Sequence, residues 1–205
     1  MQIEGFRVEG IPERTRHFRF SLQFNDGDEL LEPIFEHKGL RSLILENCLA
    51  TLLSNNVQRD MFSRLTCLRM LSFKYCGLSE LVDEISNLKL LRYLDLSYTK
   101  IKSLPDTICM LYNLQTLLLE GCEMMTDLPS NFSKLINLHH LELPYLKKMP
   151  KNIGKLNKLH SLPYFNVEEN GSDIKELEKL NHLHGSVHIE GLGNVIDPAD
   201  AVQFF

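Results

Sequence analysis

The chain lacks both the long apolar runs of a membrane protein and the excess of positive charge typical of nucleic-acid-binding proteins. It contains no run of about 18 apolar residues, so the sequence predicts no membrane-spanning helix. The formal net charge is −5, which gives no reason to expect a nucleic acid as partner. The first six residues also lack the basic and then apolar segments of a secretory signal.

Patterns for metal, nucleotide or catalytic chemistry are missing as well. None of the five cysteines forms the C-x-x-C pair typical of zinc sites, and their odd number favours reduced, packed thiols. The chain has no G-x-x-x-x-G-K-[ST] phosphate loop. His182, His184 and His188 lie near one another without an acidic residue at metal-like spacing, so we interpret them as exposed repeat histidines. The sequence therefore predicts no catalytic residue, no metal ligand and no cofactor site, and we expect no enzymatic activity.

What the chain does contain is an internal repeat. Residues 91–96 (LRYLDL) return 23 residues later as 114–119 (LQTLLL), and residues 104–108 (LPDTI) return as 128–132 (LPSNF). Several apolar positions thus recur together at a fixed period, which is the leucine-rich repeat pattern. Similar strand motifs begin at Leu40 and Leu68.

One repeat reads as a short strand followed by a turn and a short return segment. Leu94 and Leu96 alternate with Tyr93 and Asp95, so the leucines should face the core and the polar residues should face water. Pro105 lacks a backbone donor and should end the extended segment. A single coil cannot bury its leucines, so stacking of the coils must do so. We predict an α/β leucine-rich repeat solenoid with a parallel concave sheet of about eight short strands and an irregular, short-helical convex side.

The same pattern sets the expected domain limits. Residues 1–17 form a lead-in, residues 18–196 form the repeats with the first strand at 17–22, and residues 197–205 begin a truncated further repeat. A longer convex helix is expected near residues 56–65, and a capping box should start a helix at Asp173. Because the chain ends on Phe204 and Phe205 instead of a polar cap, we expect it to be a piece of a longer protein.

Stacking turns equivalent positions of successive repeats into columns on the concave face. One edge is basic in its first half, and apolar residues that should face solvent occupy two positions between the paired leucines. Tyrosines, which interface hot spots favour, stand at the opposite edge. The candidate protein-binding surface comprises Arg41, Ile44, Arg69, Lys74, Tyr75, Arg92, Tyr93, Asp95, Tyr98, Thr116, Leu118, Glu120, His140, Glu142 and Tyr145.

Another column lies where the chain leaves each strand. Small side chains with weak hydrogen-bonding ability can pack under the turn at that point. We therefore interpret the cysteines there as packing residues. The column comprises Cys48, Cys76, Thr99, Cys122 and Leu146.

These residues resemble the leucine-rich domain of plant intracellular immune receptors of the coiled-coil nucleotide-binding class. The return segment is L-P-x-x-I, and Cys or Thr stands where many repeats place Asn. Residues 11–18 (IPERTRHF) are similar to the entry into the repeats of that family, and residues 191–201 (GLGNVIDPADA) are similar to a later segment of it. The resemblance covers nearly the whole chain.

The resemblance implies a cytoplasmic sensor of plant defence. In such receptors the repeats restrain a nucleotide-binding module in its ADP-bound state and recognise a pathogen effector or a modified host protein. ADP or ATP is expected only in that module, which is absent from this chain, so no cofactor is expected here. The implied partners are proteins, with no nucleic acid and no membrane span.

Two other classes remain open. A cytosolic scaffold of the Ras-associated leucine-rich type shares the L-P-x-x-I segment, but it would keep Asn where Cys48, Cys76 and Cys122 stand. A secreted repeat protein that inhibits microbial enzymes would be favoured by glycans at Asn131 or Asn170, which both match the N-x-S acceptor pattern, or by paired cysteines.

Overall fold

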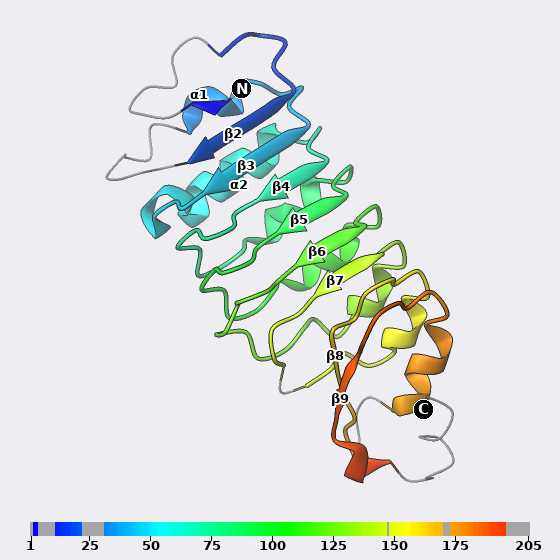
Figure 1. Cartoon of the computed structure of the whole chain (residues 1–205). Coiled ribbons are helices and arrows are strands. Elements are labelled where there is room, and N and C mark those ends of the chain that lie inside the picture. The colour runs from blue at the N-terminus through cyan, green and yellow to red at the C-terminus, as the bar shows by residue number, and fades with distance from the viewer. Residues whose placement is uncertain (1, 4–10, 22–30, 147, 170–172, 196–205) are drawn as a thin grey trace.

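The chain forms a stack of parallel strands backed by short helices, as the computed structural model shows (Figure 1). The structure describes residues 2–3, 11–21, 31–146, 148–169 and 173–195. A seven-stranded sheet follows chain order and a two-stranded sheet comes after it. All pairings are parallel, which confirms the predicted solenoid. The strands are β1 (Gln2–Ile3), β2 (His17–Ser21), β3 (Ser42–Glu46), β4 (Met70–Ser72), β5 (Tyr93–Asp95), β6 (Thr116–Leu118), β7 (His140–Glu142), β8 (Tyr164–Asn166) and β9 (His188–Glu190).

Short helices lie behind the sheet, and most of them are single 3₁₀ segments (Figure 1). The expected longer convex helix is confirmed as α2 (Asn55–Arg64), where Ser54 accepts a hydrogen bond from the N–H of Val57. None of the described helices is long and apolar enough to cross a membrane. The others are α1 (Glu32–Phe35), η2 (Ala50–Leu53), η3 (Asp83–Asn87), η4 (Asp106–Met110), η5 (Phe132–Lys134), η6 (Ile153–Lys155), η7 (Ile174–Lys179) and η8 (Leu192–Asn194).

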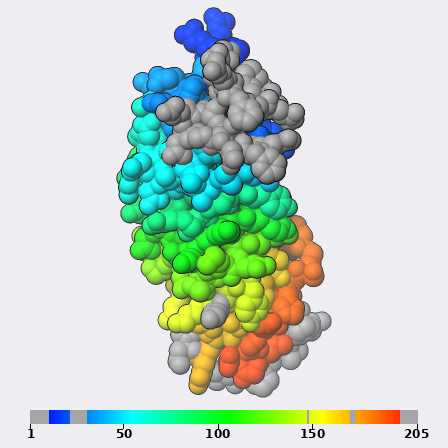
Figure 2. All heavy atoms as spheres, turned by 90° about the vertical axis from the view of Figure 1, so that its left-hand side faces the viewer, coloured from blue at the N-terminus to red at the C-terminus, as the bar shows by residue number. Residues whose placement is uncertain are grey.

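The core is a continuous layer of leucines between the strands and the helices. Leu94 and Leu96 of one repeat, and Leu117 and Leu119 of the next, have no exposed surface. Burying such a side chain contributes about 1.5–3 kcal/mol, and the contribution requires a neighbouring coil. The repeats therefore lie in chain order along an elongated molecule (Figure 2).

The strands depart from the prediction at the N-terminal edge of the sheet. Strand β1 pairs with β2, so the prediction that residues 17–22 form the first strand is wrong, and this strand is the second. The sequence around β1 has no repeat motif, so this strand could not be predicted from the repeats. The predicted further repeat at residues 197–205 lies outside the described residues, and the domain limits stay predictions.

The sheet is interrupted after β7, and Pro163 explains the interruption. Pro163 stands where Glu142 stands in the previous repeat, and proline has no N–H to donate to a neighbouring strand. Among the described residues, a single bridge, between His140 and Ser161, joins the seven-stranded sheet to this repeat. Strand pairing resumes with β8, which pairs with β9.

The column at the ends of the strands confirms the packing interpretation of the cysteines. Cys48, Cys76, Thr99 and Cys122 are all buried. Cys122 Sγ lies 3.1 Å from the carbonyl oxygen of Leu96, and Thr99 Oγ1 donates to the same oxygen at 2.7 Å. Burial raises the pKa of the Cys122 thiol. All five cysteines are free thiols, so the structure contains no disulfide.

The capping box expected at Asp173 does not form. Asp173 accepts the N–H of Lys175 and begins the 3₁₀ helix η7. The carboxylate of Glu176 accepts the N–H groups of Asn152 and Gly154 instead, at 2.9 and 2.8 Å. Glu176 therefore satisfies the open backbone donors of the neighbouring repeat and ties the two convex segments together.

The leucine layer predicts a large difference between two substitutions of the same residue type. Leu117→Ala removes a fully buried side chain at the centre of the sheet, so the free energy of unfolding should fall by about 2–5 kcal/mol. Leu90→Ala is the matched control, because Leu90 is 46% exposed, and it should change stability by at most about 0.5 kcal/mol. Urea unfolding followed by circular dichroism measures both. Equal losses would contradict the assignment of the core.

Candidate functional site

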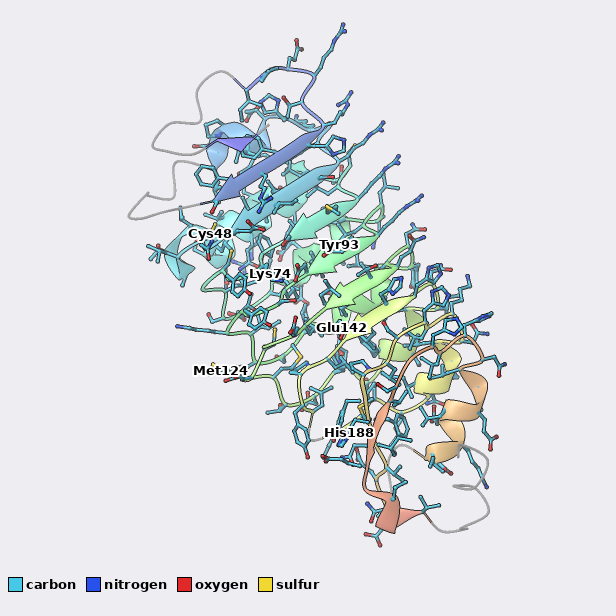
Figure 3. The ribbon with its side chains drawn as sticks, viewed as in Figure 1. Cys48, Lys74, Tyr93, Met124, Glu142 and His188 are labelled. Carbon is cyan, nitrogen blue, oxygen red and sulfur yellow. The ribbon has the colours of Figure 1, made fainter. Side chains whose placement is uncertain are left out.

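The strand face carries the predicted binding residues, but not all of them are open to solvent. Exposed members are Arg41, Arg69, Tyr75, Arg92, Tyr98, Glu120, His140 and Tyr145. Half-buried members are Ile44, Lys74, Tyr93, Thr116, Leu118 and Glu142. Figure 3 shows Lys74 beside the ends of the strands and Glu142 on β7. Whether the set binds a protein stays a prediction.

Three expectations about this face need correction. Ile44 and Leu118 are half-buried instead of solvent-facing, because each lies between side chains of neighbouring strands. Asp95, expected to be wet, is 5% exposed. One Asp95 carboxylate oxygen accepts the N–H of Ser97 at 2.9 Å, so this residue shapes the end of β5 and offers little surface to a partner.

The basic edge is a regular column of arginines, one at the start of each strand. The carbonyl oxygen of Arg41 accepts the N–H of Arg69, and that of Arg69 accepts the N–H of Arg92, both at 2.8 Å. The structure adds Arg16, whose carbonyl oxygen accepts the N–H of Arg41 at 2.7 Å. We call these four residues the arginine column. Strand spacing places neighbouring members about 4.8 Å apart at the backbone.

The side chains of Arg41, Arg69 and Arg92 have no carboxylate partner, unlike those of several other arginines. Arg19 pairs with Glu46, and Arg64 pairs with Glu36 at 2.8 Å. Within the described part of the chain, no hydrogen bond or ion pair forms at the three guanidinium groups. Their charges and donors are therefore available to an external acidic surface.

The opposite edge carries a group of aromatic and charged residues that we call the tyrosine ledge. The rings of Tyr75 and Tyr98 stack with centroids 4.7 Å apart, and Lys74 Nζ lies 5.3 and 5.5 Å from the two centroids. Tyr98 Oη donates to Glu120 Oε1 at 2.7 Å. This hydrogen bond raises the pKa of Tyr98 to about 12.

Backbone conformation aligns the ledge. Tyr75 and Tyr98 have φ of 59° and 58°, and Gly121, at the equivalent position of the next repeat, has φ of 67°. A Cβ on Gly121 would lie 2.4 Å from Cδ1 of Tyr98. Gly121 is therefore the residue that gives the Tyr98 ring room to lie against the next coil.

A second aromatic group surrounds Tyr145, and its other members were not part of the predicted set. The hydroxyls of Tyr145 and Tyr164 donate to Glu190 Oε2 at 2.8 and 3.3 Å. His188 Nε2 lies 3.3 Å from Glu190 Oε1. The hydrogen bond from Tyr145 is the main reason that the pKa of the Glu190 carboxyl is lowered. These residues come from three repeats, so only the register of β8 with β9 could have revealed them.

His182, His184 and His188 are exposed, as the sequence predicted, but they do not form one group. His188 stacks on Tyr164 with ring centroids 6.0 Å apart. His182 and His184 instead approach His160, at 6.1 and 6.0 Å between ring centroids. Equivalent positions in the repeats, rather than spacing along the sequence, bring these rings together.

The described residues show no group of three or more His, Cys, Asp and Glu side chains placed to hold a metal ion. A hollow of about 350 Å³ lies on the convex side and is lined by residues such as Asn55, Arg59 and Glu80. Arg59 pairs there with Glu84 at 3.3 Å. The arrangement of the strand face is suited to contact with a macromolecule through charge and aromatic surface.

The chain is similar to known leucine-rich repeat proteins. The family model described as "Leucine-rich repeat region" matches residues 17–111 and residues 39–190. A protein of Arabidopsis thaliana named "Putative disease resistance protein" is 38% identical over 125 residues, which are 59% of this chain and 9% of that protein. The chain thus spans about a tenth of that relative's length. The match supports the resemblance to plant disease resistance proteins.

Solved structures show the same fold. A leucine-rich repeat protein of Leptospira interrogans superposes with a TM-score of 0.59 at 28% identity, over 76% of this chain and 40% of that one. An internalin of Listeria monocytogenes superposes with a TM-score of 0.57 at 16% identity, over 87% of this chain and 50% of the other. Proteins with this fold are typically interaction scaffolds.

The tyrosine ledge predicts a measurable shift in one ionisation. Glu120→Ala removes the acceptor that stabilises the protonated phenol, so the pKa of Tyr98 should fall from about 12 toward its ordinary value near 10. Carbon NMR of ring-labelled tyrosine measures it. Glu123→Ala, which removes another exposed carboxylate nearby, should leave Tyr98 unchanged. An unaltered pKa in Glu120→Ala would mean that the ledge is not held by this bond.

Proposed function

Since the chain belongs to the leucine-rich repeat family, we propose that it is the ligand-sensing and autoinhibitory repeat portion of a plant disease resistance protein. The similarity to the Arabidopsis protein supports the plant-defence context. The partners would be the nucleotide-binding module of the same receptor and a pathogen effector or modified host protein. ADP or ATP would bind the module and not this chain, and the receptor would act in the cytoplasm.

The observation that carries the restraining role is that three members of the arginine column, Arg41, Arg69 and Arg92, have no partner at their guanidinium groups among the described residues. Three guanidinium groups at one edge hold no carboxylate within the described residues, although other arginines of the chain do. Like charges in one column repel each other, and an acidic surface of the receptor would offset that repulsion. The column also lies in the first repeats, which are closest to where the nucleotide-binding module would join the chain.

Reversing these charges should release the restraint. The triple variant Arg41→Glu, Arg69→Glu and Arg92→Glu, made in the full-length receptor and expressed in leaves, should raise cell death in the absence of any pathogen. The reason is that the variant edge would repel the acidic surface that the native edge attracts. Cell-death scoring with matched protein levels measures the effect.

The control uses the same change of charge away from the column. Lys102→Glu, Lys134→Glu and Lys155→Glu alter three exposed lysines whose side chains form no ion pair in the described structure. This variant should stay inactive without a pathogen. Unchanged restraint in the arginine variant, or equal activity in both, would contradict the proposal.

We place effector or host-protein recognition on the later repeats, around Leu118, Glu120, His140, Glu142 and Tyr145. These residues lie on β6, β7 and the segments that follow, and three of them are exposed. Glu142 is half-buried beside Glu120, and burial, with that neighbouring charge, raises its pKa. A partner that supplies a donor or a cation would stabilise both carboxylates.

Exchange of this surface between receptors should exchange specificity. The five residues are moved into a second receptor that recognises a different effector. That receptor should then recognise its own effector less well, because the contact side chains change while the leucine core does not. Leaf cell death on co-expression with each effector measures recognition. An exchange of Thr126, Ser130 and Lys134, on the segment after β6 and the start of the convex side, serves as control. Unaltered specificity after the five-residue exchange would refute this placement.

A further inference from the structure

The arginine column continues into histidines in the later repeats. The carbonyl oxygen of Arg92 accepts the N–H of Gln115, and that of Gln115 accepts the N–H of His139, at 2.8 and 2.7 Å. His139 is followed in the same way by His160 and His184, at 2.7 and 3.0 Å. One edge of the solenoid therefore carries permanent charge in its first half and titratable charge in its second half.

Four imidazoles gather around that of His160, and we call these five residues the histidine cluster. The rings of His139 and His184 stack on that of His160, with centroids 5.3 and 6.0 Å apart. His140 and His182 approach it edge-on at 5.6 and 6.1 Å. The rings come from three successive repeats, so the cluster is a product of the stacking.

The charged groups that face the cluster are few. The charge of Lys158, on the turn before His160, disfavours the protonated form of His139. Lys158 Nζ donates to Asn137 Oδ1 at 2.7 Å. Glu142, on the same strand as His140, is a carboxylate that interacts electrostatically with the His140 ring. Burial lowers the pKa of His139, and the neighbours His160, Lys158 and His140 lower it further.

This environment opposes simultaneous protonation of the rings. Imidazolium groups 5–6 Å apart repel each other, and Lys158 adds to the repulsion. An added carboxylate beside the rings would reverse the balance, because it favours their charged form. Binding of an acidic group would then take up protons, and affinity would rise as the pH falls.

We propose that the histidine cluster is a docking surface for an acidic polypeptide segment, and that protonation of the cluster strengthens the docking. Charge complementarity identifies the partner: protonated, the cluster offers several N–H donors and a local positive charge to aspartate and glutamate side chains. The column spacing of about 4.8 Å suits an extended chain laid along the edge. The surface is distinct from the arginine column and does not require the receptor role proposed above.

The test measures binding of a fluorescein-labelled peptide of alternating glutamate and serine by fluorescence anisotropy at constant ionic strength. To isolate the cluster, the protein carries Arg41→Gln, Arg69→Gln and Arg92→Gln, which remove the permanent charge nearby. Affinity should rise about tenfold between about pH 7.5 and about pH 5.5, as expected for an average uptake of about half a proton on binding over that range. The glutamates, with an ordinary pKa near 4.3, stay largely ionised over that range.

Two histidine variants decide the outcome. Adding His139→Gln, His140→Gln, His160→Gln, His182→Gln and His184→Gln, which removes the whole cluster, should abolish the rise. Adding His17→Gln, His37→Gln and His188→Gln, outside the cluster, should preserve it. Circular dichroism verifies that both variants fold. A rise that persists without the cluster, or no rise in the parent protein, would overturn the proposal.

A second measurement does not depend on any variant. Peptide added at about pH 6.5, close to the ordinary imidazole pKa, should shift the ring NMR signals of His139, His160 and His184 toward those of the protonated form. His37 should not respond. Signals that stay unchanged at saturating peptide would also overturn the proposal. Neither result depends on autoactivity or effector recognition, so failure here and failure of the receptor role are distinguishable.

Discussion

Burial of leucines between successive coils is the interaction on which the rest of this structure depends. Leu94, Leu117 and Leu141 each lie under the next coil with no exposed surface, and no coil could bury them alone. The parallel ladder fixes their register, since Leu94 lies opposite Leu117 and Leu117 opposite Leu141. Every outward position is thereby placed beside its counterpart, about 4.8 Å away. The columns of equivalent residues on the surface therefore follow from the packing of the leucine core.

This constraint has an electrostatic cost that the core must offset. Side chains of one charge at equivalent positions are brought together whether or not they attract, as with Arg41, Arg69 and Arg92. Exposed charges at such distances interact weakly in water, so the column is tolerated. Pairing to carboxylates would relieve it, as Glu46 does for Arg19, but the column arginines have no such partner among the described residues. Fold stability gains nothing from that arrangement, which leaves these charges available to a surface outside the chain.

The sequence predicted most of what depends on period and alternation. The parallel solenoid, the buried leucines, helix α2 and the thiol column all follow from apolar residues at fixed intervals. Features that depend on one backbone group or on a neighbouring repeat could not be predicted this way. Strand β1 has no repeat motif in the sequence. Pro163 interrupts the sheet because it stands at a position whose N–H would otherwise donate to the neighbouring strand. Asp95 is buried because its carboxylate accepts the N–H of Ser97. His182 and His184 meet His160 through the stacking, which a linear spacing does not show.

The tyrosine ledge shows how a surface can run against local preference. A residue other than glycine with positive φ costs about 1–2 kcal/mol, and a bulky side chain makes that conformation rare. Asn47 fits its position because asparagine tolerates it, and Gly121 is free of the cost, yet Tyr75 and Tyr98 adopt it in consecutive repeats. Their rings are exposed, so core packing does not require them. Stacking, Lys74 and Glu120 then hold both rings in one orientation, which lowers the entropy lost when a partner is bound. The ledge is therefore an exposed, ordered aromatic surface that carries backbone strain which core packing does not require.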